Sequence, residues 1–103
     1  GDGKRESLRL TLFVAGRKPS SSRALENARE ICRKCIPGEH RLEVVDIFED
    51  PAAAKENGIV AVPALVRAAP GGTRKVVGDL SDRVTVCRAL GLPQRLNSGQ
   101  GRA

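Results

Sequence analysis

The feature that most constrains this 103-residue chain is an apolar run, Ile59 to Val66, with Pro63 in its interior. Proline has no N–H to donate, and the residue before it is pushed toward extended geometry. A proline here argues against a plain central strand, unless it stands at the strand's start or follows a cis peptide bond. We therefore expect a turn at Val62–Pro63 that leads into a buried strand over 64–68, and the sequence leaves the isomer of that bond open.

The residues before this run predict two strands and two helices. Residues 8–14 alternate and then become continuously apolar, which is typical of a strand buried on both sides. Ser20 to Ser22 offer hydroxyls that can cap a helix over 21–35, whose apolar residues repeat at helical spacing. A second strand is expected over 41–47. Asp50 and Pro51 then favour the start of a short helix that ends at Asn57–Gly58.

The residues after the run predict a hairpin and a last helix. Pro70–Gly72 is a strong turn signal, and 73–77 is expected to be the returning strand. Ser81 can cap a helix over 82–90. The predicted order β-α-β-α-β-β-α, with a right-handed βαβ crossover and helices on both faces of the sheet, indicates an α/β, thioredoxin-like fold. We expect one domain over 8–92, with a disordered N-terminus (1–7) and a disordered tail (93–103).

The residues that thioredoxin chemistry requires are not where that chemistry needs them. A reactive thiolate needs the positive end of the first helix, but Ser20 to Ser22 stand there. The Cys-x-x-Cys pair, Cys32 and Cys35, lies at the other end of the same helix. Cys32, Cys35, His40 and Cys87 lack the second half of a zinc-binding spacing pattern. We therefore expect no catalytic residue, no metal and no cofactor, and a protein that is not an enzyme.

The composition narrows the class of partner. The chain carries a net charge of +6, with some of its basic residues near its ends, and Phe13 and Phe48 are the only aromatic residues. A platform for stacked bases needs several exposed aromatics, so no nucleic-acid partner is expected. Three cysteines, an odd number, suggest reduced thiols in a cytosol. No apolar run approaches the roughly 20 residues that span a bilayer, so we expect a cytoplasmic protein without a membrane partner.

Several blocks of the chain, spread over 8–90, together resemble the KaiB family of circadian clock proteins: 12–16, Pro19, 21–25, 44–47, Pro51, 59–65 and 76–83. The resemblance implies a small non-enzymatic partner of KaiC, a hexameric ATPase and autokinase. It implies that such a protein docks on the KaiC ring, recruits KaiA and displaces a sensor histidine kinase with its own KaiB-like domain. It also implies a metamorphic fold, with a second state that rearranges the second half of the chain and often forms a tetramer.

The resemblance also implies roles for individual residues. Those matching partner-binding positions lie on the first helix, on the short helix and its loop, and on the hairpin: Arg23, Lys55, Glu56, Asn57, Arg74 and Lys75. Those matching positions linked to the change of fold are Pro63, Gly78 and Asp79. The acidic tail of many clock proteins of this family is absent, so a role in stress adaptation or a simpler timer stands beside a role in a clock.

Three alternatives stay open at this point. The β-branched run Val84–Cys87 would serve as a strand as easily as a helix, which fits the rearranged state, although we expect the thioredoxin-like state for the isolated chain. The chain could be the KaiB-like sensor domain of a histidine kinase. It could also be a thiol redox protein that uses Cys32 and Cys35. A homo-oligomer, either a dimer or a tetramer, is compatible with the sequence.

Overall fold

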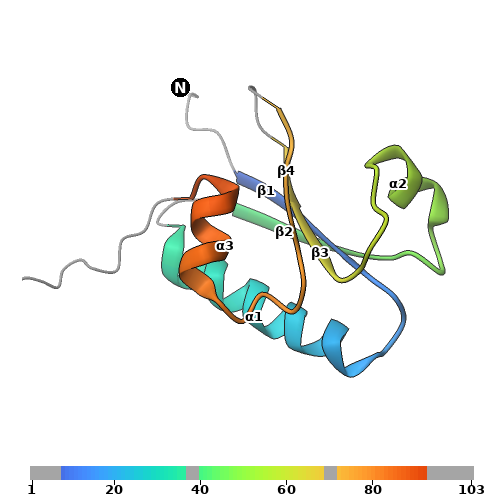
Figure 1. The fold of residues 1–103 in the computed structure, drawn as a ribbon, viewed down its shortest axis with the longest axis horizontal. Helices are drawn as coiled ribbons and strands as arrows, with labels where there is room; N and C mark the ends of the chain where they lie inside the picture. The colour runs from blue at the N-terminus through green and yellow to red at the C-terminus, as the bar shows by residue number, and fades with distance from the viewer. Residues whose placement is uncertain (1–7, 37–39, 69–71, 93–103) are drawn as a thin grey trace, which may run out of the picture.

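A computed structural model describes residues 8–36, 40–68 and 72–92 of the chain. Four strands and three helices follow the predicted order (Figure 1): β1 (Leu8–Val14), α1 (Pro19–Cys35), β2 (His40–Asp46), α2 (Pro51–Glu56), β3 (Ala64–Arg67), β4 (Arg74–Val77) and α3 (Arg83–Leu90). The expected disorder of 1–7 and 93–103, and the Pro70–Gly71 part of the predicted turn, lie outside the described residues.

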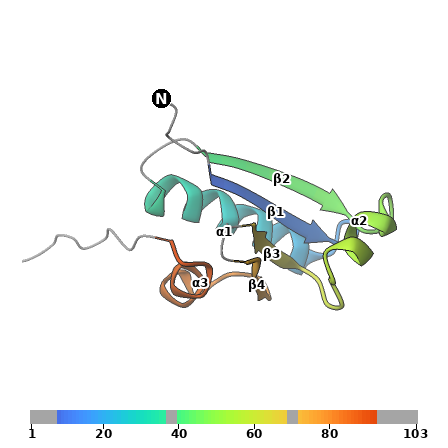
Figure 2. The ribbon, with the colours of Figure 1, turned by 90° about the horizontal axis from the view of Figure 1, so that it is seen from above.

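The four strands form one sheet in the order β2-β1-β3-β4. β1 and β2 are parallel, with Leu8 opposite His40, and β3 and β4 each run antiparallel to the neighbour before them. The C-terminal ends of β1, β2 and β4 and the start of β3 therefore meet at one end of the sheet. Figure 2 shows α2 beside the arrowheads of β1 and β2. We call this end of the molecule the α2 end.

The two faces of the sheet are covered unequally. On one face α1 packs against β1 and β2 and α3 packs against β4, and these contacts, with those between α1 and α3, make the larger core cluster. On the other face α2 covers a smaller cluster built around Phe13, Ala54 and Val66. Helices thus lie on both faces, as predicted, and this fold is thioredoxin-like. α2 is only six residues long, so it covers that face at one end only.

The starts of two helices differ from the prediction. α1 begins at Pro19, because proline is favoured at the first helical position, and no side chain caps it. The predicted caps Ser20 to Ser22 are therefore wrong, and these serines lie inside the first turn. α3 is capped by Asp82 rather than Ser81, since the Asp82 carboxylate accepts the N–H of Thr85 at 3.2 Å. The predicted Asp50 cap of α2 is confirmed, with the Ala53 N–H at 3.1 Å.

The turn predicted before the third strand is also confirmed. The Val62–Pro63 peptide bond is cis, and β3 begins directly after it at Ala64. The carbonyl of Pro63 accepts the N–H of Gly78 at 2.8 Å, which fixes this turn to the end of β4.

Candidate partner-binding surface

Four of the residues expected to bind a partner lie in or reach the segment that closes α2. Lys55 and Glu56 are exposed in its last turn, and Asn57 follows at the C-cap. Lys75 reaches this segment from β4, because its Nζ donates to the carbonyl oxygens of Asn57 at 3.4 Å and Gly58 at 3.1 Å. Lys75 therefore ties β4 to the two residues that directly follow α2.

Arg74, the neighbour of Lys75, belongs to a different surface. It lies opposite Arg67 on β3 and on the sheet face that α1 and α3 cover. Arg67 Nη1 donates to the carbonyls of Leu90 at 2.7 Å and Gly91 at 2.9 Å, and so caps the end of α3. The Arg74 guanidinium lies beside Gly91, where a Cβ would be 3.4 Å from its Cζ. Sequence reasoning missed Arg67. The signal that could have found it is a cation in an otherwise apolar strand.

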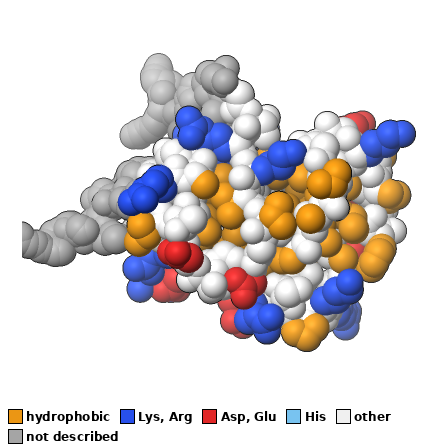
Figure 3. Space-filling model, in the orientation of Figure 1, with side chains coloured by type: hydrophobic (Ala, Val, Ile, Leu, Met, Phe, Trp, Pro, Cys, Tyr) orange, Lys and Arg blue, Asp and Glu red, His pale blue; other side chains and the backbone are white. Residues whose placement is uncertain are grey.

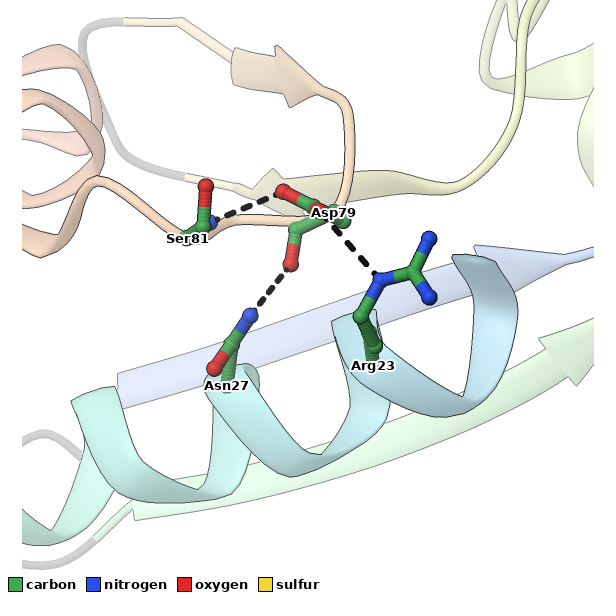
Figure 4. A network of polar contacts seen from close by, with 4 residues as sticks. All are labelled: Arg23, Asn27, Asp79 and Ser81. Carbon is green, nitrogen blue, oxygen red and sulfur yellow. Dashed lines mark hydrogen bonds and ion pairs between the residues drawn. The ribbon is translucent and has the colours of Figure 1, made fainter. Parts of the chain in front are cut away.

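Arg23, on α1, points toward the junction between β4 and α3 (Figure 4). Asp79, in that junction, is the centre of a polar network. Arg23 Nε lies 3.5 Å from Asp79 Oδ2, and Ser81 donates its N–H to Asp79 Oδ1 at 3.1 Å. Asn27, which sequence reasoning also missed, donates to the Asp79 carbonyl at 2.7 Å. Hydrogen bonds from Ser81, with help from Arg23, lower the pKa of the Asp79 carboxyl.

The three residues expected to take part in a change of fold form one chain of contacts. Pro63 accepts the Gly78 N–H, and Gly78 precedes Asp79. Gly78 has a φ of +128°, a conformation that side chains with a Cβ rarely adopt. This chain of contacts links the turn before β3 to α1 through Asn27. The contacts are a geometric fact, and a role in a change of fold stays a prediction.

Three large apolar side chains are exposed at the α2 end, and the sequence had not singled out any of them. Val60 is 97% exposed, Phe48 69% and Val77 56%. Phe48 follows β2, Val60 precedes β3 and Val77 ends β4, so the topology brings them to the same end of the sheet. Figure 3 shows hydrophobic side chains gathered in the right half of the face in view, with Lys and Arg among and around them. We name Phe48, Lys55, Val60, Lys75 and Val77 the α2-end surface.

The three cysteines do not form a catalytic thiol site. Cys32, Cys35 and Cys87 are free and buried, and Cys32 and Cys35 close α1 instead of starting it. Burial raises the pKa of Cys32 to about 11 and that of Cys87 to about 12, which is the opposite of what a nucleophile needs. Within the described residues, no three His, Cys, Asp or Glu side chains are placed to hold a metal ion. Nor is any helix in those ranges both long and apolar enough to cross a membrane.

Comparison with known proteins gives a consistent result. The family model described as the KaiB domain matches residues 11–92. The circadian clock oscillator protein KaiB of Prochlorococcus marinus is 41% identical over 88 residues, which are 85% of this chain and 75% of that protein. The protein of the same name from Trichodesmium erythraeum is 42% identical over 83 residues, which are 81% of this chain and 80% of that one.

Solved structures agree with the fold. The N-terminal domain of Synechococcus elongatus SasA superposes with a TM-score of 0.68 at 27% identity, covering 95% of this chain and 90% of that domain. Mitochondrial thioredoxin 3 from Saccharomyces cerevisiae superposes with a TM-score of 0.66 at 18% identity, covering 85% of this chain and 80% of that one. The second likeness shows the thioredoxin-like fold alone.

Proposed function

This chain belongs to the KaiB family of circadian clock proteins, and from that premise we propose that it binds the ring of a KaiC-type hexameric ATPase through its α2-end surface. It is a non-enzymatic regulator. The relatives are named as clock oscillator proteins, and the expected lack of enzymatic activity follows from membership of that family. The ring, the surface and the effect on timing or stress signalling make up the proposal.

The observation that carries the proposal is the exposure of Val60, Phe48 and Val77 at the same end of the molecule as Lys55 and Lys75. Single exposed apolar residues are ordinary on a protein surface, but several at one end of a small domain favour an interaction site. Apolar anchors surrounded by polar groups are the usual anatomy of a protein–protein interface. The two lysines fit an acidic surface on the partner, because complementary charge favours encounter and correct orientation.

Arg74 and Arg23 have a weaker claim to bind the ring. Arg74 lies beside the end of α3, and Arg23 is paired with Asp79 at the junction before α3. If either contacts a partner, we propose that it contacts a second one, KaiA or a sensor histidine kinase. Glu56 and Asn57 belong with the ring-facing group, since they follow Lys55 directly.

The experiment that tests the proposal is co-elution with the KaiC-type ring on size exclusion, with ATP, with ADP and without nucleotide. We expect nucleotide-dependent association that Lys55→Glu and Lys75→Glu weaken. Arg41→Glu is the matched control, because Arg41 is an exposed cation on β2 at the opposite end of the sheet. Absence of association with an intact ring, under every nucleotide condition, would refute the proposal.

A second candidate function is the KaiB-like sensor domain of a histidine kinase. The observation that favours it is the similarity to the N-terminal domain of SasA. The mass of the native gene product separates the two candidates, because a sensor domain is joined covalently to a kinase module and a free regulator is not. The thiol redox alternative lacks a comparable observation, since Cys32 and Cys35 are buried at the wrong end of α1.

Two further parts of the proposal concern the state of the chain. We propose a single domain over 8–92, a cytoplasmic location, and a second arrangement in which the residues after β3 repack and the chain forms a dimer or tetramer. The β-branched run Val84–Cys87 within α3 and the positive φ of Gly78, directly after β4, support this second arrangement. Light scattering during size exclusion, over a range of protein concentrations, tests it.

A further inference from the structure

We propose that Cys35 and Cys87 are a redox-modification site, at which a two-electron oxidant forms an intramolecular disulfide that ties α3 to α1. The two residues are 52 positions apart in the chain, and their Sγ atoms lie 2.8 Å from each other. A disulfide bond is about 2.05 Å long, so the two sulfurs need to approach by less than about 1 Å. The site requires neither the ring nor any other partner.

The surroundings keep these two sulfurs together. Cys35 is the last residue of α1 and Cys87 lies within α3, and each is only 1% exposed in the larger core cluster. Ile31 and Leu90, about one turn away on the same helices, are buried in that cluster too. Close packing of this kind fixes side-chain positions, so the thiol pair is a defined feature of the interface between the helices.

The disulfide would add a covalent link between α3 and the C-terminal end of α1. The Asp79 network joins α1 to the junction before α3 through Arg23, near the start of α1, and Asn27, at its middle. At the other end of α1 the contact is apolar and sulfur-based. A buried cysteine often serves only as a small apolar residue. Two that touch across an interface can in addition be joined covalently.

The reaction balances with hydrogen peroxide as the oxidant. One thiolate attacks a peroxide oxygen, the O–O bond breaks, and a sulfenic acid and water form. The second thiol then displaces the sulfenic oxygen as water while the S–S bond forms. In total, two thiols and one hydrogen peroxide give one disulfide and two water molecules. A small dithiol reverses the reaction by exchange, as expected of transient disulfides in a reducing compartment.

Burial controls the rate of this reaction. It raises the pKa of Cys87 to about 12, so the thiol stays protonated while α3 is packed. The attack on peroxide therefore proceeds from conformations in which α3 has moved away from α1, and it accelerates as the pH rises. The S–S bond then forms when α3 packs against α1 again. Cys32 is the competing thiol, because it lines an open groove of about 410 Å³ between α1 and β2.

Peptide mapping tests the site on the full chain. The reduced protein is treated with hydrogen peroxide, free thiols are alkylated, and the product is digested with trypsin without reduction. Trypsin cuts after Arg33, Lys34 and Arg88, so the three cysteines fall on three different peptides. We expect a linked pair of the peptides 35–41 and 84–88, which disappears on treatment with dithiothreitol.

The variants make the assignment unambiguous. Cys32→Ala is expected to keep the linked pair, and Cys35→Ala and Cys87→Ala to lose it. The oxidised protein is expected to melt on the order of 10 °C higher than the reduced protein, because the bond closes a long loop. Should either single variant fail to fold, the mapping of the wild-type and Cys32→Ala chains decides alone. Three results would each overturn the inference. The first is linkage through Cys32, and the second is disulfides between chains. The third is a native protein in which Cys35 and Cys87 stay free although the urea-unfolded chain becomes linked.

Discussion

Replacement of Val60 by serine should weaken binding to the ring without weakening the fold. The side chain is 97% exposed in the free protein, so it contributes almost nothing to the core. Full burial of a valine in the complex would contribute about 1.5–3 kcal/mol. Because 1.4 kcal/mol is a factor of ten, Val60→Ser is expected to raise the Kd about 10- to 100-fold. The free energy of unfolding should stay within about 0.5 kcal/mol of the wild-type value.

The assay is a titration of fluorescently labelled protein with the KaiC-type ring in the presence of ATP, paired with urea denaturation of each variant. Val44→Ser is the matched control. Val44 is also an exposed valine, at 46%, but it lies on the edge strand β2, at the other side of the sheet from β4. The control is expected to bind with wild-type affinity.

Two results would refute the reasoning. If Val60→Ser binds as tightly as the wild type, Val60 is not buried by the ring and the α2-end surface is not its docking site. If Val44→Ser weakens binding as much as Val60→Ser does, the loss is not specific to that surface. A lowered urea midpoint for Val60→Ser would contradict the exposure from which the prediction starts.

Three further predictions concern stability. Asn27→Ala removes the 2.7 Å hydrogen bond to the Asp79 carbonyl, and thermal melting should show a loss of about 1 kcal/mol, or roughly 4–8 °C in Tm. Gly58→Ala places a Cβ at a φ of +65° and 3.4 Å from Lys75 Nζ, so urea denaturation should show a loss of about 1–2 kcal/mol. Hydrogen bonds lower the pKa values of Asp79 and Asp82 below their ordinary 3.8, so these groups stabilise the fold above that pH. Tm should therefore fall as the pH drops below about 4, and less steeply for Asp82→Asn.

The order of elements could be predicted from the sequence because each signal is local. The alternation in 8–14 and the helical spacing that follows have different periods, and proline and glycine mark the breaks. Helix starts were less predictable where two local rules compete. The rule that serine caps a helix favoured Ser20 to Ser22, whereas the preference of proline for the first position moved the start to Pro19.

The surface was harder to predict than the fold, because it depends on contacts between distant residues. Asn27 and Asp79 are 52 positions apart, and Lys75 meets the carbonyl of Gly58 across 17. No local pattern indicates such pairs. The exposure of Val60 was also unpredictable from local sequence. It belongs to an apolar run that predicts burial, yet α2 ends before it and leaves it uncovered.

Arg74 and Lys75 provide a way to determine which surface of the protein meets the ring. Neighbouring residues of a strand point to opposite faces, and here Arg74 lies beside the end of α3 while Lys75 reaches the end of α2. The same charge reversal at adjacent positions therefore tests two separate surfaces. If Lys75→Glu weakens association and Arg74→Glu does not, the ring contacts the α2 end. The reverse result would place the ring over α3 and refute the proposed docking site, although the family assignment would still stand.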